Sequence, residues 1–99
     1  MLTDPQPPEI RLEKRGPKGR YILDLNGAEA EMTWSRMSRD RIIVDHTFVP
    51  DAMRGTGAGR ALVERLVADA RKDGFKVLPL CPFVRGMAER HPEWSDVFV

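Results

Sequence analysis

The sequence predicts an α+β (mixed α/β) fold, in which an antiparallel meander is joined to a parallel strand pair through a crossover, with two helices. Three observations lead to this prediction. Short alternations of apolar and charged residues fill the first part of the chain, a β-branched run follows at 41–49, and an amphipathic helical pattern begins at Gly59. A strand, a helix and a second strand in this order form a right-handed crossover, which makes the two strands parallel.

The length and composition fit one small domain. The chain has 99 residues, of which 41% are hydrophobic and 31% are charged, and these values are typical of a single globular domain. Residues 1–9 contain three prolines and no apolar periodicity. We therefore predict a flexible lead-in at 1–9 and one domain at 10–99.

Charge and hydropathy limit the partners that we expect. The formal net charge of +1 argues against nucleic acid or a membrane surface as the partner. No apolar stretch is long enough for a membrane span or a secretory signal, so we expect a cytoplasmic protein, as a monomer or a weak homodimer. The single cysteine, Cys81, excludes an internal disulfide, and its spacing from His46 and His91 predicts no metal site.

The first part of the chain predicts three antiparallel strands. Apolar and polar residues alternate at 10–13, and apolar residues concentrate at 21–25, with a turn at 16–19 between them. Asn26-Gly27 is a strong hairpin signal, because both central positions of a type I′ turn need positive φ. It leads into a third strand at 28–36.

The second part predicts the parallel pair and both helices. The β-branched run at 41–49 indicates a central strand that is covered on both faces. An amphipathic helix runs from Gly59 to near Gly74, and a short strand follows at 75–80. A second helix at 84–90 ends before Pro92.

A glycine-rich loop stands between the strand at 41–49 and the first helix. Its sequence, Arg54-Gly55-Thr56-Gly57-Ala58-Gly59-Arg60, has three glycines at alternate positions, which let the backbone approach a ligand with no Cβ in the way. Free N–H groups and the positive end of the helix dipole meet at a helix start. A phosphate or pyrophosphate suits such a loop, and the two arginines would add charge-assisted contacts. Close packing of the strand against the helix is the alternative reason for the glycines.

The spacing of the glycines decides between three phosphate loops. A Walker A loop needs Lys and then Ser or Thr after its last glycine, whereas Gly59 is followed by Arg60-Ala61. The dinucleotide pattern G-x-G-x-x-G fails because its last position does not fall on a glycine from either start. The pattern [Gln/Arg]-x-x-Gly-x-[Gly/Ala] fits with Arg54, Gly57 and Gly59, and it resembles the acetyl-coenzyme A loop of the GNAT superfamily of N-acetyltransferases.

Segments on both sides of the loop are also similar to those of a small single-domain branch of this superfamily. They are Asp45-His46-Thr47-Phe48-Val49, Cys81-Pro82-Phe83 and His91-Pro92-Glu93-Trp94, and the resemblance covers roughly residues 10–98. The chain lacks the two helices that follow the first strand in the full-length superfamily pattern and help to build the acceptor site. The resemblance therefore leaves the acceptor open.

The resemblance implies acetyl-coenzyme A as the cofactor and a set of residues that would hold it. Pantetheine would lie in a gap between the two parallel strands and pair with backbone of the first strand, while the pyrophosphate would rest on N–H groups of the loop. The implied cofactor-binding residues are Thr47, Phe48, Val49, Arg54, Gly55, Thr56, Gly57, Ala58, Gly59 and Arg60.

Two residues near the implied acyl group are candidates for catalysis. His46 has the intrinsic pKa of a general base, although a histidine in a strand can also serve only as a hydrogen-bonding group. We expect Asp45 on the opposite face, where it could pair with an arginine. Cys81 could accept the acyl group or protonate the leaving thiolate, and its alternative is a small buried side chain. Direct transfer, without acylation of the protein, is the more usual superfamily route.

The implied function is transfer of an acetyl group from acetyl-coenzyme A to an amine, either a small molecule or a lysine side chain. The alternative is a catalytically silent module that binds coenzyme A or another protein, because the acceptor-side helices are missing.

Overall fold

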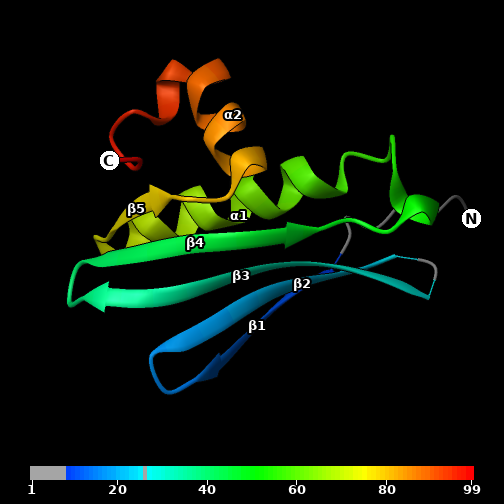
Figure 1. The fold of residues 1–99 in the computed structure, drawn as a ribbon, viewed down its shortest axis with the longest axis horizontal. Coiled ribbons are helices and arrows are strands. Elements are labelled where there is room, and N and C mark those ends of the chain that lie inside the picture. The colour runs from blue at the N-terminus through cyan, green and yellow to red at the C-terminus, as the bar shows by residue number, and fades with distance from the viewer. Residues whose placement is uncertain (1–8, 26) are drawn as a thin grey trace, which may run out of the picture.

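The computed structural model of the protein describes residues 9–25 and 27–99 (Figure 1). The lead-in predicted for 1–9 lies outside the described residues except for Glu9, which is the first residue of a strand. Asn26 of the predicted Asn26-Gly27 turn also lies outside them, and Gly27 has the positive φ, 82°, that this turn type needs.

One mixed sheet of five strands, in the order β1-β2-β3-β4-β5, forms the centre of the fold (Figure 1). The first four strands pair antiparallel, and β4 pairs parallel with β5. The predicted fold class is therefore confirmed. The strands are β1 (Glu9–Arg15), β2 (Lys18–Leu25), β3 (Ala28–Ser38), β4 (Arg41–Phe48) and β5 (Lys76–Pro79).

Two α-helices and two short 3-10 helices complete the described part of the chain. α1 (Ala58–Asp73) forms the crossover between β4 and β5, and α2 (Pro82–Arg90) follows β5. The 3-10 helix η1 (Asp51–Met53) precedes the glycine-rich loop, and η2 (Pro92–Trp94) follows α2. None of the described helices is both long and apolar enough to cross a membrane.

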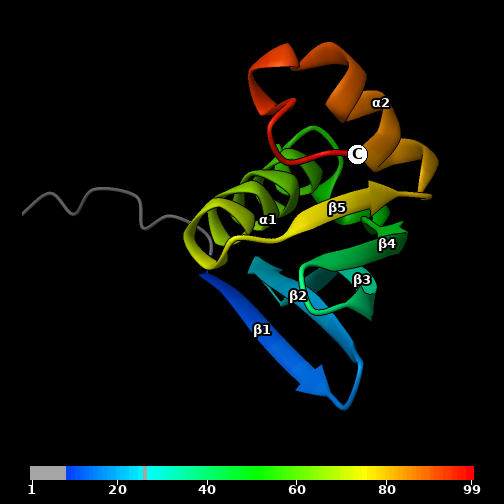
Figure 2. The ribbon, with the colours of Figure 1, turned by 90° about the vertical axis from the view of Figure 1, so that its left-hand side faces the viewer.

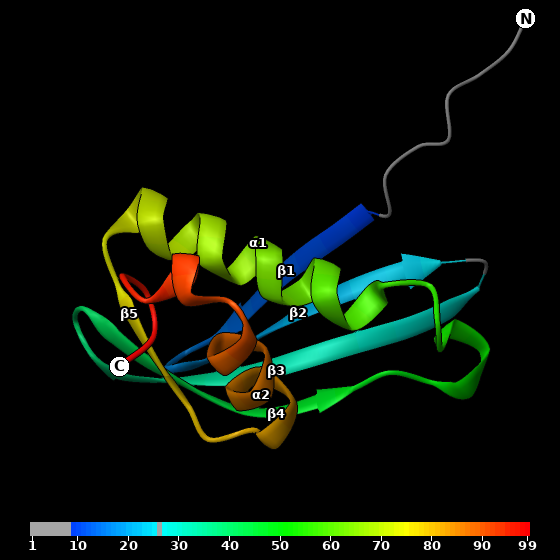
Figure 3. The ribbon, with the colours of Figure 1, turned by 90° about the horizontal axis from the view of Figure 1, so that it is seen from above.

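The described helices cover one face of the sheet and leave its other face uncovered. Figures 2 and 3 show α1 along one face of the sheet, with α2 next to it on the β5 side. In β4, Ile42 and Val44 are buried beneath the helices, whereas Asp45 and His46 are exposed. The prediction that this strand is covered on both faces is therefore wrong. Its β-branched residues reflect its place between two partner strands, β3 and β5, and burial of one face only.

The core lies between α1 and the sheet. Leu62 and Leu66 of α1 are fully buried in one cluster with Met32 of β3 and Val44 of β4. These leucines are four positions apart, so they lie on one face of the helix, as the amphipathic pattern predicts. Packing of this stripe fixes the direction of α1, and therefore the place where α1 begins.

The turn between β1 and β2 is shorter than predicted. Arg15 pairs with Lys18, so the turn consists of Gly16-Pro17 alone, and Lys18 and Gly19 belong to β2. Gly19 lies opposite Trp34 of β3, and a Cβ on Gly19 would overlap Cζ2 of the indole. The glycine thus makes room for a large ring that is only 5% exposed.

This contact predicts the effect of a side chain at position 19. Gly19→Ala should lower the free energy of unfolding by about 1–3 kcal/mol, because the buried Trp34 ring has to shift. Trp34→Phe removes the benzo-ring atoms that the new methyl group meets, together with an indole Nε1 that has no hydrogen-bond partner in the described structure. The alanine should therefore cost less in the Trp34→Phe background than in the wild type, as measured by urea unfolding. Equal costs in both backgrounds would contradict the contact.

A tyrosine joins α1 to the sheet and predicts a pH dependence of stability. The hydroxyl of Tyr21 donates a hydrogen bond of 2.8 Å to Oδ2 of Asp69. Burial, and then this bond, raise the pKa of Tyr21 above its usual range. The unfolded chain therefore loses this proton first, and the stability should decrease as the pH rises above about 10. Urea unfolding of wild type and Tyr21→Phe at pH 8–11 tests this, since the variant should show a weaker decrease.

Candidate functional site

The parallel strands separate at Val44. The β4–β5 ladder ends with the pair Val44 and Pro79. The carbonyl oxygen of Val44 accepts hydrogen bonds from the backbone N–H of Leu80, at 3.0 Å, and of Cys81, at 3.1 Å, and α2 begins directly afterwards. β4 continues to Phe48. From residue 45 onwards, the edge of β4 that faces β5 therefore has no partner strand within the described residues. The gap expected between the parallel strands is present.

A β-bulge changes the orientation of β4 at the same place. Trp34 of β3 pairs with Val44, and Thr33 pairs with His46, so Asp45 is an extra residue in β4. Thr33 Oγ1 donates a hydrogen bond to the carboxylate of Asp45. Asp45 and His46 therefore lie on the same, uncovered face of the sheet as Thr33. The expectation that Asp45 lies on the opposite face and pairs with an arginine is wrong, because the extra residue changes the alternation.

The loop after β4 needs two of its glycines for its backbone conformation. Gly55 and Gly57 have φ angles of 79° and 84°, in the left-handed region that favours glycine. A Cβ on either residue would meet nothing within 4 Å, so crowding is not the reason for them. Thr56 closes the turn, since its N–H and its hydroxyl both donate to the carbonyl of Met53.

The start of α1 presents unpaired N–H groups. The helix begins at Ala58, one residue before the predicted start, and Gly57 is its N-cap, with no side-chain hydrogen bond to the first turn. Ala61 N–H is bonded to the carbonyl of Gly57 at 2.9 Å, whereas the N–H groups at 58–60 precede the first intrahelical bonds. No carboxylate stands in this first turn. The N–H groups and the helix dipole together favour an anion here.

These features line one groove of about 730 Å³. All but one of the predicted cofactor residues line it, from Thr47 in β4 to Arg60 in α1. The exception is Thr56, whose side chain closes the turn instead. The groove also contains residues that the sequence analysis did not assign to the site, which are Pro50, Asp51, Met53, Phe83 and Met87.

Phe83 and Met87 come from α2, which begins two residues earlier than predicted. The two residues are four positions apart, so one face of this short helix carries both of them. That spacing, together with the Cys81-Pro82-Phe83 segment, was the available signal for their place in the groove. Gly59 also differs from the expectation, because a Cβ there would be 2.6 Å from Cζ of Phe83. The space at Gly59 is therefore filled by a side chain of this protein.

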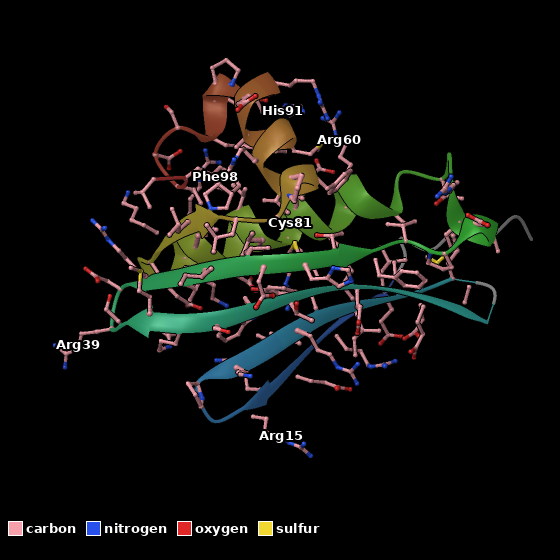
Figure 4. All side chains as sticks on the ribbon, viewed as in Figure 1. Arg15, Arg39, Arg60, Cys81, His91 and Phe98 are labelled. Atoms are coloured by element: carbon pink, nitrogen blue, oxygen red, sulfur yellow. The ribbon has the colours of Figure 1, made fainter. Side chains whose placement is uncertain are left out.

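Two arginines line the groove near the start of α1. Arg54 Nε lies 3.1 Å from Oδ1 of Asp51, and Arg60 Nε lies 3.6 Å from Oε1 of Glu64. Their side chains are 77% and 57% exposed, so these pairs hold the guanidinium groups only weakly. Figure 4 shows Arg60 on the helix side of the sheet, whereas Arg39 lies at the opposite end of β4. Both groove arginines can therefore turn towards an anion.

The two candidate catalytic residues lie on different sides of the β4 edge. Cys81 lies at the start of α2 (Figure 4) and is 5% exposed. It does not line the groove itself, but its Sγ is 3.4 Å from Oγ1 of Thr47, which does. His46 is exposed on the uncovered face and does not line the groove. Within residues 9–25 and 27–99, no three His, Cys, Asp or Glu side chains are grouped to hold a metal ion.

Comparisons with known proteins agree with this geometry. The structure is similar to the NMR solution structure of a GCN5-like protein from Staphylococcus aureus, with a TM-score of 0.68 and 30% sequence identity. The similarity covers 90% of this chain and 87% of that chain. No match is found among curated proteins. The model of the GCN5-related N-acetyl-transferase family matches residues 20–97. The chain therefore belongs to the GCN5-related N-acetyltransferase family.

Proposed function

We propose that this chain is a cytoplasmic enzyme that transfers an acetyl group from acetyl-coenzyme A to an amine. The observation that carries the proposal is the continuity of the groove, which joins the uncapped start of α1 to the unpaired edge of β4. The helix start suits the phosphates of coenzyme A. The strand edge offers backbone N–H and C=O groups to the amides of the pantetheine arm.

The residues present fit this donor. Gly55 and Gly57 leave open space above the loop backbone, so a pyrophosphate can come close to the N–H groups. Arg54 and Arg60 supply mobile positive charge at that end. Apolar side chains also line the groove and suit the methylene and methyl groups of the pantetheine arm.

The chain also carries groups for the proton transfers. When bound, acetyl-coenzyme A supplies an acyl group that is activated as a thioester. Transfer to an amine requires a group that removes a proton from the amine and a group that returns one to the departing sulfur. His46 is exposed beside the gap and can accept a proton from an amine that arrives on the uncovered face. Thr47 lines the groove and is paired with the buried Cys81, and this pair can hold a proton for the sulfur.

The burial of Cys81 favours direct transfer over an acyl-enzyme. The residue is 5% exposed and its Sγ lies against Thr47, so an acyl group could reach Sγ only after that contact opens. The amine belongs to a small molecule or to a lysine side chain. The uncovered face supports both, because no described helix limits the size of the acceptor there.

A catalytically silent module that binds coenzyme A is the second candidate. It is favoured by the exposure of His46 and by its position outside the groove. Purified protein with acetyl-coenzyme A and a panel of polyamines, amino acids and lysine peptides separates the two. Release of free thiol above the rate of hydrolysis supports the enzyme, whereas tight binding without thiol release supports the module.

Arg60, one of the two arginines that line the groove, should strengthen coenzyme A binding through its positive charge. Arg60→Gln should weaken binding of coenzyme A about tenfold, because it removes a charge-assisted contact to phosphate. Arg39→Gln is the matched control, since it changes the net charge equally at the far end of β4 and should leave the affinity unchanged. Calorimetric titration measures both. Equal losses would mean that only the overall charge matters.

Substitution of the two candidate catalytic residues should affect different quantities. His46→Gln should lower kcat about 10²-fold while the affinity for coenzyme A stays unchanged, because His46 lies outside the groove. Cys81→Ala should retain measurable turnover if transfer is direct. Steady-state rates and intact mass after incubation with acetyl-coenzyme A measure these effects. An acetyl adduct that disappears in Cys81→Ala would instead support an acyl-enzyme.

A further inference from the structure

The last glycine of the loop differs from the other two in its surroundings. Gly55 and Gly57 have positive φ and open space, whereas Gly59 lies in α1 without positive φ and is buried. A Cβ on Gly59 would lie 2.6, 3.0 and 3.4 Å from Cζ, Cε2 and Cε1 of Phe83. The backbone conformation at position 59 therefore does not require glycine, but the observed position of the Phe83 ring does.

A glycine inside a helix is unfavourable by about 1 kcal/mol relative to alanine. The loop pattern also admits alanine at this position, and an alanine here would collide with the ring. The absence of a side chain at Gly59 thus has a specific consequence, which is that the edge of the Phe83 ring rests on the backbone of α1 in its first turn.

The backbone of Phe83 is held in place as well. It is the second residue of α2, after Pro82, which suits the first helical position. The helix start is bound to the end of the β4–β5 ladder by the hydrogen bond from Cys81 N–H to the carbonyl of Val44. The ring therefore bridges α2 and α1 beside the gap, and 39% of the residue remains exposed in the groove.

We propose that Phe83 is a coenzyme-binding residue whose ring forms the wall of the groove for the pantetheine arm, and that Gly59 is glycine in order to seat this ring. The inference rests on the proposed function, because it assigns a ligand to the same groove. Phe48, which is 51% exposed, also lines the groove, so exposed apolar area is concentrated there. Pantetheine carries methylene and methyl groups that suit such surfaces, whereas the phosphates meet the arginines and the helix start.

A double-mutant cycle of Gly59→Ala and Phe83→Ala tests this assignment. Phe83→Ala should weaken coenzyme A binding about tenfold, because it removes the aromatic ring whose apolar surface the pantetheine arm would cover. Gly59→Ala should also weaken binding, because the methyl group displaces the ring. In the Phe83→Ala background, the further Gly59→Ala change should alter the affinity less than about twofold. Gly86→Ala in α2 is the matched control and should leave the affinity unchanged, because its Cβ meets only Nη1 of Arg90, at 3.4 Å.

A second ligand separates the pantetheine contact from the phosphate contact. Adenosine 3′,5′-bisphosphate lacks the pantetheine arm, so Phe83→Ala should leave its affinity unchanged. If Gly59→Ala weakens coenzyme A binding equally in the wild-type and Phe83→Ala backgrounds, the proposed contact between Gly59 and the Phe83 ring is overturned and Gly59 is assigned to the phosphate. The proposed contact between Phe83 and the pantetheine arm is overturned if Phe83→Ala binds coenzyme A as tightly as the wild type. It is also overturned if Phe83→Ala loses equal affinity for coenzyme A and for adenosine 3′,5′-bisphosphate.

Folding and the proposed function are controlled separately. Thermal unfolding shows whether each variant is folded at the temperature of titration, and Phe83→Leu replaces Phe83→Ala in the cycle if the latter is unfolded. Wild-type protein that binds no coenzyme A would overturn the proposed function and this inference together. Wild-type binding with additive losses would overturn the inference alone.

Discussion

The carbonyl oxygen of Val44 is the point on which the site depends. It accepts two N–H groups, from Leu80 and Cys81, at the end of the parallel ladder. In a strand that continued, consecutive N–H groups would point to opposite sides, so only one of these two could pair with β4. Instead the chain turns into α2, and the edge of β4 beyond this carbonyl stays open. The same hydrogen bonds therefore end the sheet, start the helix that carries Phe83, and create the strand edge of the groove.

The start of α1, which also borders the groove, is positioned by packing of the rest of that helix against the sheet. The buried stripe of α1, with Leu62 and Leu66, holds the helix against the sheet, and the left-handed Gly57 then lets the chain enter the helix without a side-chain cap. An ordinary capping residue would stabilise the helix start by about 1 kcal/mol, but it would occupy the N–H groups that an anion needs. The uncapped start is stable enough because the core supplies most of the stability of α1.

Local patterns predicted the elements of the fold, and long-range contacts decided the rest. The order and type of every strand and α-helix, and the loop that lines the groove, follow from periodicity and glycine spacing. The bulge at Asp45 could not be predicted, because an extra residue is defined only by the register with β3. The contact at Gly59 could not be predicted for a similar reason, since Phe83, the ring that a Cβ there would meet, lies far along the chain. The coverage of β4 was overestimated because a β-branched run does not reveal which face a helix packs on.

The uncovered face of the sheet shows how the domain dispenses with a second helical layer. Arg11 pairs with Asp24 and Glu29, Arg20 pairs with Glu13 and Glu31, and between these ion pairs Ile22 is only 1% exposed. Long charged side chains thus cover the apolar surface that helices cover in larger folds. His46 on this face remains open to water. For the proposed acetyl transfer, the cover that keeps water out at this face has to come from the acceptor, whether that is a small amine or a lysine side chain.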